Sequence, residues 1–252
     1  MKRIIKKNPV VAVAQIKYFD ISSVNNIEKI KRYIKLAKKK DADIVCFPES
    51  CVHKKLSFHK NHKFIDEIRK ECKNNKIWAI VTEDIEIRGK VYNASLLINR
   101  KGKIVGDYEK IHLYGDKVNP GRKVKVFNTD FGKIGIAICW DLAFPELFKK
   151  MKKEGAKIIF CPSQWWYDSI AHEEKHQVRE LEILESLVRV RAYENVCFVV
   201  LCNPVMDSKY QISYSAIVSP TKILSKIVER EGLITSKINL SEIKKLEEHY
   251  RD

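Results

Sequence analysis

The stretch "GIAICWDLAFPE", residues 135–146, decides the fold because it joins a buried strand directly to a turn and then to a helix. Four residues suited to a buried strand, 135–138, lead into Cys139, Trp140 and Asp141. A proline follows, and after it comes a mixture of apolar and charged residues typical of an amphipathic helix. Cys139 therefore lies where a strand ends, and it is either a small core residue or a nucleophile held at the turn.

The segments on both sides of this stretch alternate between strand and helix patterns. Helical spacing of apolar residues predicts helices over 24–37, 64–72, 144–154 and a longer run ending near residue 193. Strands are predicted at 9–16, 43–48, 77–84, 91–99, 102–110, 123–128, 156–162, 196–202, 213–219, 223–229 and 233–239, before a charged helix. This order predicts an α/β fold in which residues 1–252 form one layered domain with its helices outside.

Composition limits the classes of protein to consider. The chain has 252 residues, of which 45% are hydrophobic, so it can bury one large core. Its apolar runs are too short to cross a bilayer, and its first residues lack the pattern of a signal peptide. Its seven cysteines are an odd number scattered through apolar segments, which is typical of a reducing compartment. We therefore expect a cytoplasmic protein without membrane association.

The charge of the chain is strongly positive, with 48 Lys and Arg against 32 Asp and Glu. Of these cations 37 are Lys and 11 are Arg, whereas base readout and phosphate clamping favour Arg. The lysine runs at 38–40, 149–150 and 152–153 lie on predicted amphipathic helices, with no aromatic residues between them. Solvated helix faces explain these runs better than a nucleic-acid surface does.

Three chemically useful side chains follow predicted strands: Glu49 after "DIVCFP", Lys110 after "GDYE" and Cys139 after "GIAI". Each one alone is weak evidence, because a loop carboxylate or a lysine is common. A thiol, however, becomes a strong nucleophile when a base and a cation lie close to it. The three residues together would supply such a set if the fold brings their strand ends to one place.

Four motifs carry a resemblance to a known family: "FPES" at 47–50, "YEKIHLYG" at 108–115, "GIAICWDLAFPE" at 135–146 and "RAYEN" at 191–195. In this order and at these separations they resemble the nitrilase superfamily of carbon-nitrogen hydrolases. The resemblance covers roughly residues 9–240. Asp141 favours the amidase-like branches, because true nitrilases typically carry Glu at that position.

The resemblance implies a four-layer α-β-β-α sandwich and a homodimer or a higher homo-oligomer. It makes Glu49 the general base, Lys110 the electrostatic stabiliser and Cys139 the nucleophile, with no metal or cofactor. The backbone N–H of Trp140 would join Lys110 in binding the oxyanion. The substrate implied is a small amide or N-carbamoyl compound, cleaved through a thioester.

Two departures from the family pattern leave alternatives open. Many members carry a further Glu before the "PG" that follows the lysine, whereas this chain has Asp116, which either takes that orienting role or has none. Many members also carry Arg four residues after the cysteine, whereas this chain has Ala143. A substrate with a terminal carboxylate would lose the anchor that such an Arg provides, so substrates of this kind are less expected. Trp165, in the segment 161–168, either lines the substrate pocket or packs in the core.

Two other functions are alternatives to that of an amidase. A nitrilase would use the same cysteine on a C≡N carbon, and a non-catalytic basic binding protein could keep the fold without turnover. The Cys and His residues between 46 and 72 match no compact zinc pattern. Glu146, Arg191 and Glu194 are predicted to make structural ion pairs or hydrogen bonds.

Overall fold

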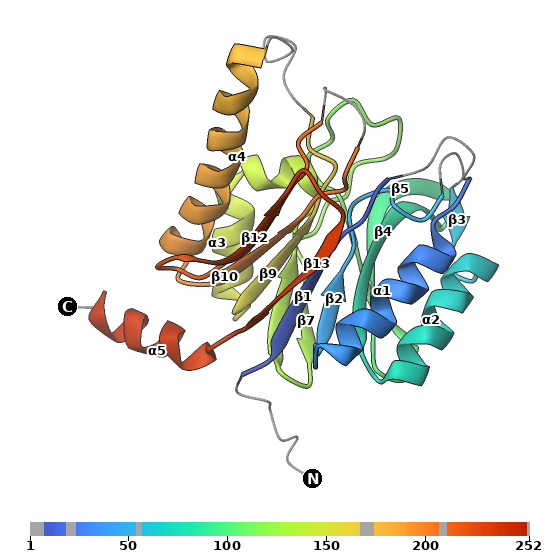
Figure 1. The fold of residues 1–252 in the computed structure, drawn as a ribbon, viewed down its shortest axis with the longest axis horizontal. Coiled ribbons are helices and arrows are strands. Elements are labelled where there is room, and N and C mark those ends of the chain that lie inside the picture. The colour runs from blue at the N-terminus through green and yellow to red at the C-terminus, as the bar shows by residue number, and fades with distance from the viewer. Residues whose placement is uncertain (1–7, 19–23, 54–56, 167–173, 207–210, 251–252) are drawn as a thin grey trace.

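The computed structural model describes residues 8–18, 24–53, 57–166, 174–206 and 211–250, and these form two β-sheets packed face to face (Figure 1). The strands of the first sheet, in spatial order, are β13 (Gly232–Lys237), β1 (Val10–Gln15), β2 (Ile44–Cys46), β4 (Trp78–Ile87), β5 (Lys90–Ile98) and β6 (Ile104–Glu109), with β3 (Phe58–His59) paired to β4. Those of the second sheet are β12 (Ile223–Val228), β11 (Tyr214–Val218), β10 (Phe198–Cys202), β9 (Ile158–Pro162), β8 (Gly132–Ile136) and β7 (Val126–Thr129).

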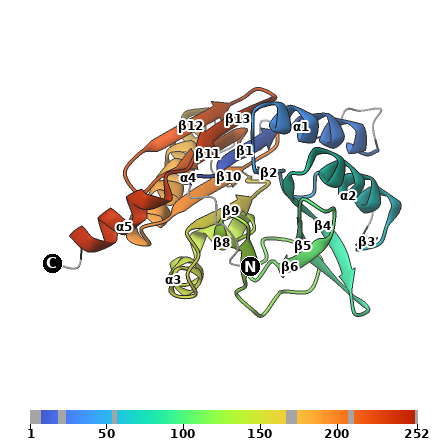
Figure 2. The same cartoon turned by 90° about the horizontal axis from the view of Figure 1, so that it is seen from below.

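Helices cover the outer faces of both sheets, which makes the predicted α-β-β-α sandwich (Figures 1 and 2). Helices α1 (Ile27–Lys39) and α2 (Lys63–Asn75) pack on the first sheet, and α3 (Pro145–Lys153) and α4 (Glu174–Glu194) pack on the second. Helix α5 (Leu240–His249) follows β13 and extends away from the sheets at the C-terminal side (Figure 1). The predicted fold class is confirmed.

The alternation of side chains along each strand divides the core into two layers. On β1, Val11 and Val13 point into the cluster between the sheets, whereas Ala12 and Ala14 belong to the cluster beneath α1 and α2. The central strands β9 and β10 are buried along their whole length, because a sheet lies on one side of them and a helix on the other. Burial on both faces explains why these segments read as continuous apolar runs.

The direction of the strands places the ends of several of them at one edge of the sandwich. Strands β1, β2 and β4 run parallel to one another, and so do β8, β9 and β10. Parallel sheets gather the loops that follow their carboxyl ends, which is where α/β proteins commonly build their sites. Glu49 follows β2, Cys139 follows β8, and Gln164 follows β9.

Within the described residues, no helix combines the length and apolar character that are needed to cross a bilayer. The sequence patterns placed most elements within a few residues of their observed bounds. They did not predict β3, a two-residue strand parallel to β4, nor the pairing of β13 with β1. That pairing joins segments from opposite parts of the chain, which no local pattern encodes.

Candidate active site

Cys139 begins a short 3₁₀ turn, Cys139–Ala143, and two residues separate it from the end of β8. Its backbone has a φ of 47°, a left-handed conformation that residues with a Cβ rarely adopt. Such strain persists only where the surrounding structure holds it, and it is commonly stored at functional sites. The side chain is 7% exposed, and its Sγ lies 3.7 Å from the carbonyl oxygen of Gln164.

Asp141 holds this turn in place from a fully buried position. Its Oδ2 accepts hydrogen bonds from the Ile138 N–H at 3.0 Å and from the Tyr108 hydroxyl at 2.8 Å. Its Oδ1 accepts one from the His112 N–H at 2.9 Å. Tyr108 and His112 flank Lys110 in sequence, so one carboxylate links the turn that carries the cysteine to the segment that carries the lysine.

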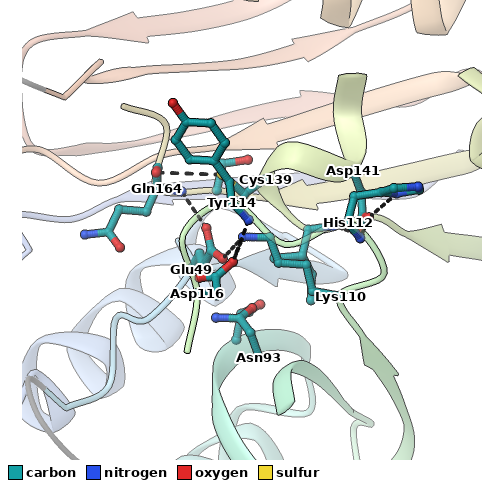
Figure 3. Close-up of polar contacts among 12 residues, drawn as sticks. Glu49, Asn93, Lys110, His112, Tyr114, Asp116, Cys139, Asp141 and Gln164 are labelled. Carbon is teal, nitrogen blue, oxygen red and sulfur yellow. Dashed lines mark hydrogen bonds and ion pairs between the residues drawn. The ribbon is translucent and has the colours of Figure 1, made fainter. Parts of the chain in front are cut away.

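Glu49, Lys110 and Asp116 point toward one another beside this turn (Figure 3). Lys110 Nζ donates to Glu49 Oε1 and to Asp116 Oδ2, both at 2.9 Å. Glu49 and Lys110 are 3% and 2% exposed, whereas the Asp116 side chain is 24% exposed. The structure thus brings the three predicted catalytic residues to one place and adds Asp116 as a second anion on the lysine.

Gln164 connects the carboxylate to the thiol through its backbone. Its N–H donates to Glu49 Oε2 at 3.0 Å, while its carbonyl oxygen lies 3.7 Å from the Cys139 Sγ (Figure 3). The Glu49 N–H in turn donates to the Ser163 carbonyl at 3.2 Å. The role of Gln164 was missed in the sequence, because a backbone contact depends on position and leaves no signature in residue type.

Burial and the neighbouring charges have opposite effects on the pKa values of Glu49 and Lys110. Burial raises the pKa of Glu49, and the neighbouring Lys110 lowers it without cancelling that effect. Burial alone would lower the pKa of Lys110, but the negative charges of Glu49 and Asp116 outweigh it and raise that pKa. The pKa of the Cys139 thiol lies well above its usual value because of burial and the adjacent Glu49. Lys110 is therefore a permanent cation, and the thiol is protonated at rest.

A cavity of about 240 Å³ opens onto Cys139. Its lining residues are mostly aromatic or aliphatic: Tyr114, Cys139, Trp140, Ala143, Trp165, Trp166, Glu180, Ile183 and Leu187. Trp165 is 6% exposed and lies 5.6 Å, ring centre to ring centre, from Trp140. It thus packs in the core and also lines the cavity, and its contact with a substrate stays a prediction. Four larger hollows on the described surface are lined by none of Glu49, Lys110, Asp116 and Cys139.

The remaining predicted polar residues serve the scaffold. Arg191 pairs with Glu194 at 3.0 Å and donates to the carbonyl oxygen of Leu142, which ties α4 to the end of the 3₁₀ turn. Glu146 lies 4.0 Å from the His112 ring. Among the described residues, no three His, Cys, Asp or Glu side chains are grouped as ligands for a metal ion.

A second buried carboxylate, Glu83 on β4, supports the loop that follows Glu49. Its Oε2 accepts hydrogen bonds from the N–H groups of Val52 and His53 at 2.9 and 3.1 Å. The side chain is almost inaccessible, and burial raises its pKa to about 8. The folded protein therefore holds a proton here at pH values where the unfolded chain has released it.

Because the folded protein holds a proton on Glu83 that the unfolded chain releases, the free energy of unfolding falls as the pH rises. The stabilisation from Glu83 is complete below pH 4.5, declines as the pH rises, and is lost above about 8. Glu83→Gln is always neutral, so the free energy of unfolding of this variant should fall less steeply across that window, by up to about 1.4 kcal/mol per pH unit. Urea unfolding at several pH values measures the slope, with Glu86→Gln on the same strand as the control. An unaltered slope in Glu83→Gln would show that this group does not titrate.

A family model described as carbon-nitrogen hydrolase matches residues 10–248. The chain belongs to this family. As a carbon-nitrogen hydrolase it is an enzyme that acts on C–N bonds other than peptide bonds, and its predicted placement in the amidase-like part of the nitrilase superfamily is confirmed.

Two curated carbon-nitrogen hydrolases illustrate the relationship. "Nitrilase homolog 2" of Dictyostelium discoideum is 28% identical over 86% of this chain and 71% of its own length. "Omega-amidase NIT3" of Saccharomyces cerevisiae is 24% identical over 94% of this chain and 89% of its own length. The crystal structure of Saccharomyces cerevisiae Nit3, "a member of branch 10 of the nitrilase superfamily", superposes with a TM-score of 0.83 over 98% of this chain and 96% of that one. At 24% identity this structural match shows the shared fold.

Proposed function

We propose that this enzyme hydrolyses a small amide or N-carbamoyl compound through a thioester on Cys139, with Glu49 as the general base and Lys110 as the electrostatic stabiliser. The observation that carries the proposal is the buried ion pair between Lys110 and Glu49, at 2.9 Å, beside a cysteine that opens onto a cavity. Burial of an ion pair away from water costs free energy. Activation of the neighbouring thiol would explain why the pair is kept despite this cost.

Proton transfer from the thiol to Glu49 needs no new net charge in the buried site. Before transfer one negative charge lies on Glu49, and after transfer it lies on the thiolate, while the Lys110 ammonium and the Asp116 carboxylate beside it are unchanged. The raised pKa of Glu49, caused first by burial, makes this carboxylate a better proton acceptor than an exposed one. Lys110 stays charged throughout and stabilises whichever neighbour is negative.

The chemical steps follow from this arrangement. The thiolate attacks the carbonyl carbon, and the charge that develops on the oxygen is met by Lys110 and the Trp140 N–H, each such donor being typically worth about 3 to 4 kcal/mol. Protonated Glu49 then gives its proton to the departing ammonia or amine, which leaves a thioester. The same carboxylate activates a water molecule, and attack by this water releases the acid and restores the thiol.

Release of ammonia tests the proposal directly. Primary amides, N-carbamoyl compounds and nitriles of matched side chain should be assayed with the purified enzyme, and kcat/KM should be highest for an amide or carbamoyl compound. A preference for nitriles of about tenfold or more would replace this function with that of a nitrilase. The name of the yeast relative, an omega-amidase, supports the amide reading.

Asp116 is proposed to orient Lys110, because its Oδ2 accepts a hydrogen bond from Nζ and a second one from the Tyr114 N–H at 3.1 Å. In Asp116→Ala the ammonium loses one of its two anionic partners and can move away from the developing oxyanion. We expect kcat to fall by about tenfold to a hundredfold. Steady-state kinetics with the best amide measures the loss, and Asp116→Glu should recover part of it. A rate equal to that of wild type would exclude an orienting role.

Self-association and a cytoplasmic location complete the proposal. Helix α4 exposes Ile183, Val190 and Tyr193, which are 43%, 47% and 59% accessible, and an apolar face of this kind is suited to contact with a second copy. Sedimentation of the purified protein should give the mass of a dimer or a larger assembly. The seven cysteines are all free thiols, as expected in a reducing compartment.

A further inference from the structure

Among the described residues that line the cavity at Cys139, one is charged, and that charge is negative. Glu180 lies on α4 with Ile183 and Leu187, three and seven residues further on, so the three side chains follow one face of the helix. The Glu180 side chain is 13% exposed. Its described ionic partner, Arg179 at 3.6 Å, is itself 52% exposed and does not line the cavity.

The other residues that line the cavity are suited to bind flat and apolar groups. Four aromatic rings line the cavity, from Tyr114, Trp140, Trp165 and Trp166, and Trp140 lies within 5.0 Å of Tyr114 and 5.6 Å of Trp165, measured between ring centres. Aromatic faces attract cations as well as apolar surfaces. A volume of about 240 Å³ equals that of about eight water molecules, which restricts the substrate to a small molecule.

No cation in the described lining is available to bind a carboxylate on the substrate. Ala143 contributes only a methyl group to the wall. Lys110 is 2% exposed and is already paired with Glu49 and Asp116, so its charge belongs to the reaction centre. The formal charge of +16 on the whole chain acts mainly from the surface, where salt screens it beyond about 8 Å.

We propose that the substrate is an amide whose acyl part is flat and apolar and carries a positive charge at the end remote from the amide, where Glu180 and the aromatic rings receive it. The inference rests on the proposed function of Cys139 and specifies its substrate class. A carboxylate at that remote end would face Glu180 without a compensating cation in the described wall, and such substrates are disfavoured.

Three benzamides that differ only in their para group test this inference: 4-(aminomethyl)benzamide, 4-methylbenzamide and 4-carbamoylbenzoate. We expect kcat/KM for the cationic compound to exceed that for the anionic compound by about tenfold or more, with the neutral compound between them. In Glu180→Gln the ratio of cationic to neutral should fall toward one. Glu182→Gln, an exposed carboxylate on the same helix, is the matched control and should keep the wild-type ratio.

A second variant adds the missing cation. Ala143→Arg places a guanidinium in the wall of the cavity, and we expect it to raise the ratio of anionic to cationic turnover. Preference of the wild type for 4-carbamoylbenzoate would overturn the inference, and so would an equal loss of the cationic preference in Glu180→Gln and Glu182→Gln.

Protection of Cys139 from iodoacetamide separates failure of the inference from failure of the proposed function. The three benzamides should slow alkylation in the same order, cationic most and anionic least, whether or not they are turned over. Protection in this order without hydrolysis of any amide would contradict the proposed function and leave only the preference of the cavity for cations. Hydrolysis of other amides, with no protection and no turnover by any benzamide, would overturn the inference and keep the proposed function.

Discussion

Replacement of Cys139 by alanine is expected to abolish amide turnover, with a loss of about 10⁴-fold or more, because no other group in the site can form the thioester. The fold should survive this change. The thiol faces a cavity that already exists, so its removal opens little new space, and alanine and cysteine are similarly restricted at a φ of 47°. We expect the melting temperature to stay within about 4 °C of the wild type.

Two measurements on Cys139→Ala separate a nucleophile from a core residue. Ammonia release gives the activity, and thermal unfolding gives the stability. Cys72→Ala is the matched control, since Cys72 is fully buried on α2 and has no part in the cluster, so turnover should persist in it. In the wild type, iodoacetamide should label Cys139 while the other six thiols stay unmodified. Labelling spread over several cysteines, or large unfolding of Cys139→Ala, would make Cys139 a core residue. Turnover retained in Cys139→Ala would exclude it as the nucleophile.

Replacement of Lys110 by methionine is expected to reduce both activity and stability. Methionine fills a similar volume but leaves the buried Glu49 carboxylate without its cation, and removal of one partner of a buried pair typically costs about 3 to 5 kcal/mol. Turnover should fall by about a hundredfold or more, because the developing oxyanion loses one of its two donors. Urea unfolding and steady-state kinetics measure the two effects on the same preparation.

The double variant Glu49→Gln with Lys110→Met distinguishes a lost charge pair from a simple packing defect. Since the double variant leaves no unpaired charge at Glu49, it should recover part of the unfolding free energy that Lys110→Met loses. Activity should not recover, because the base is now also absent. If the losses in the two single variants simply add in the double variant, the two residues do not interact in solution.

The chemistry of the site could be predicted from the sequence more fully than its surroundings could. Glu49 and Cys139 follow apolar runs that read as buried strands, and they reach one site because β2 and β8 end at the same edge of the sandwich. Residue type and motif carry this information. The sequence left the role of Asp116 undecided, because that role depends on whether its loop reaches Lys110. In the structure Asp116 accepts a hydrogen bond from Lys110 Nζ.

The residues that could not be predicted act through contacts between distant segments. The Gln164 N–H reaches a carboxylate that lies 115 residues earlier in the chain, and the Tyr108 hydroxyl reaches Asp141 across 33 residues. Glu180 enters the cavity because α4 packs across β10 and β11, not because of any pattern around it. Each of these contacts depends on how layers pack, whereas sequence periodicity reports only which face of an element is apolar.

The pairing of β13 with β1 has a consequence for synthesis of the protein in the cell. Strand β1 hydrogen-bonds to β13 along all six of its residues, from Val10 opposite Lys237 to Gln15 opposite Gly232. A nascent chain therefore leaves the ribosome with the sequence "VVAVAQ" lacking one hydrogen-bonding neighbour until residues 232–237 follow. An apolar strand with an unsatisfied edge readily joins other chains. Chaperones that bind such edges would act on this protein from an early point until late in translation, when the residues of its active site have already been synthesised.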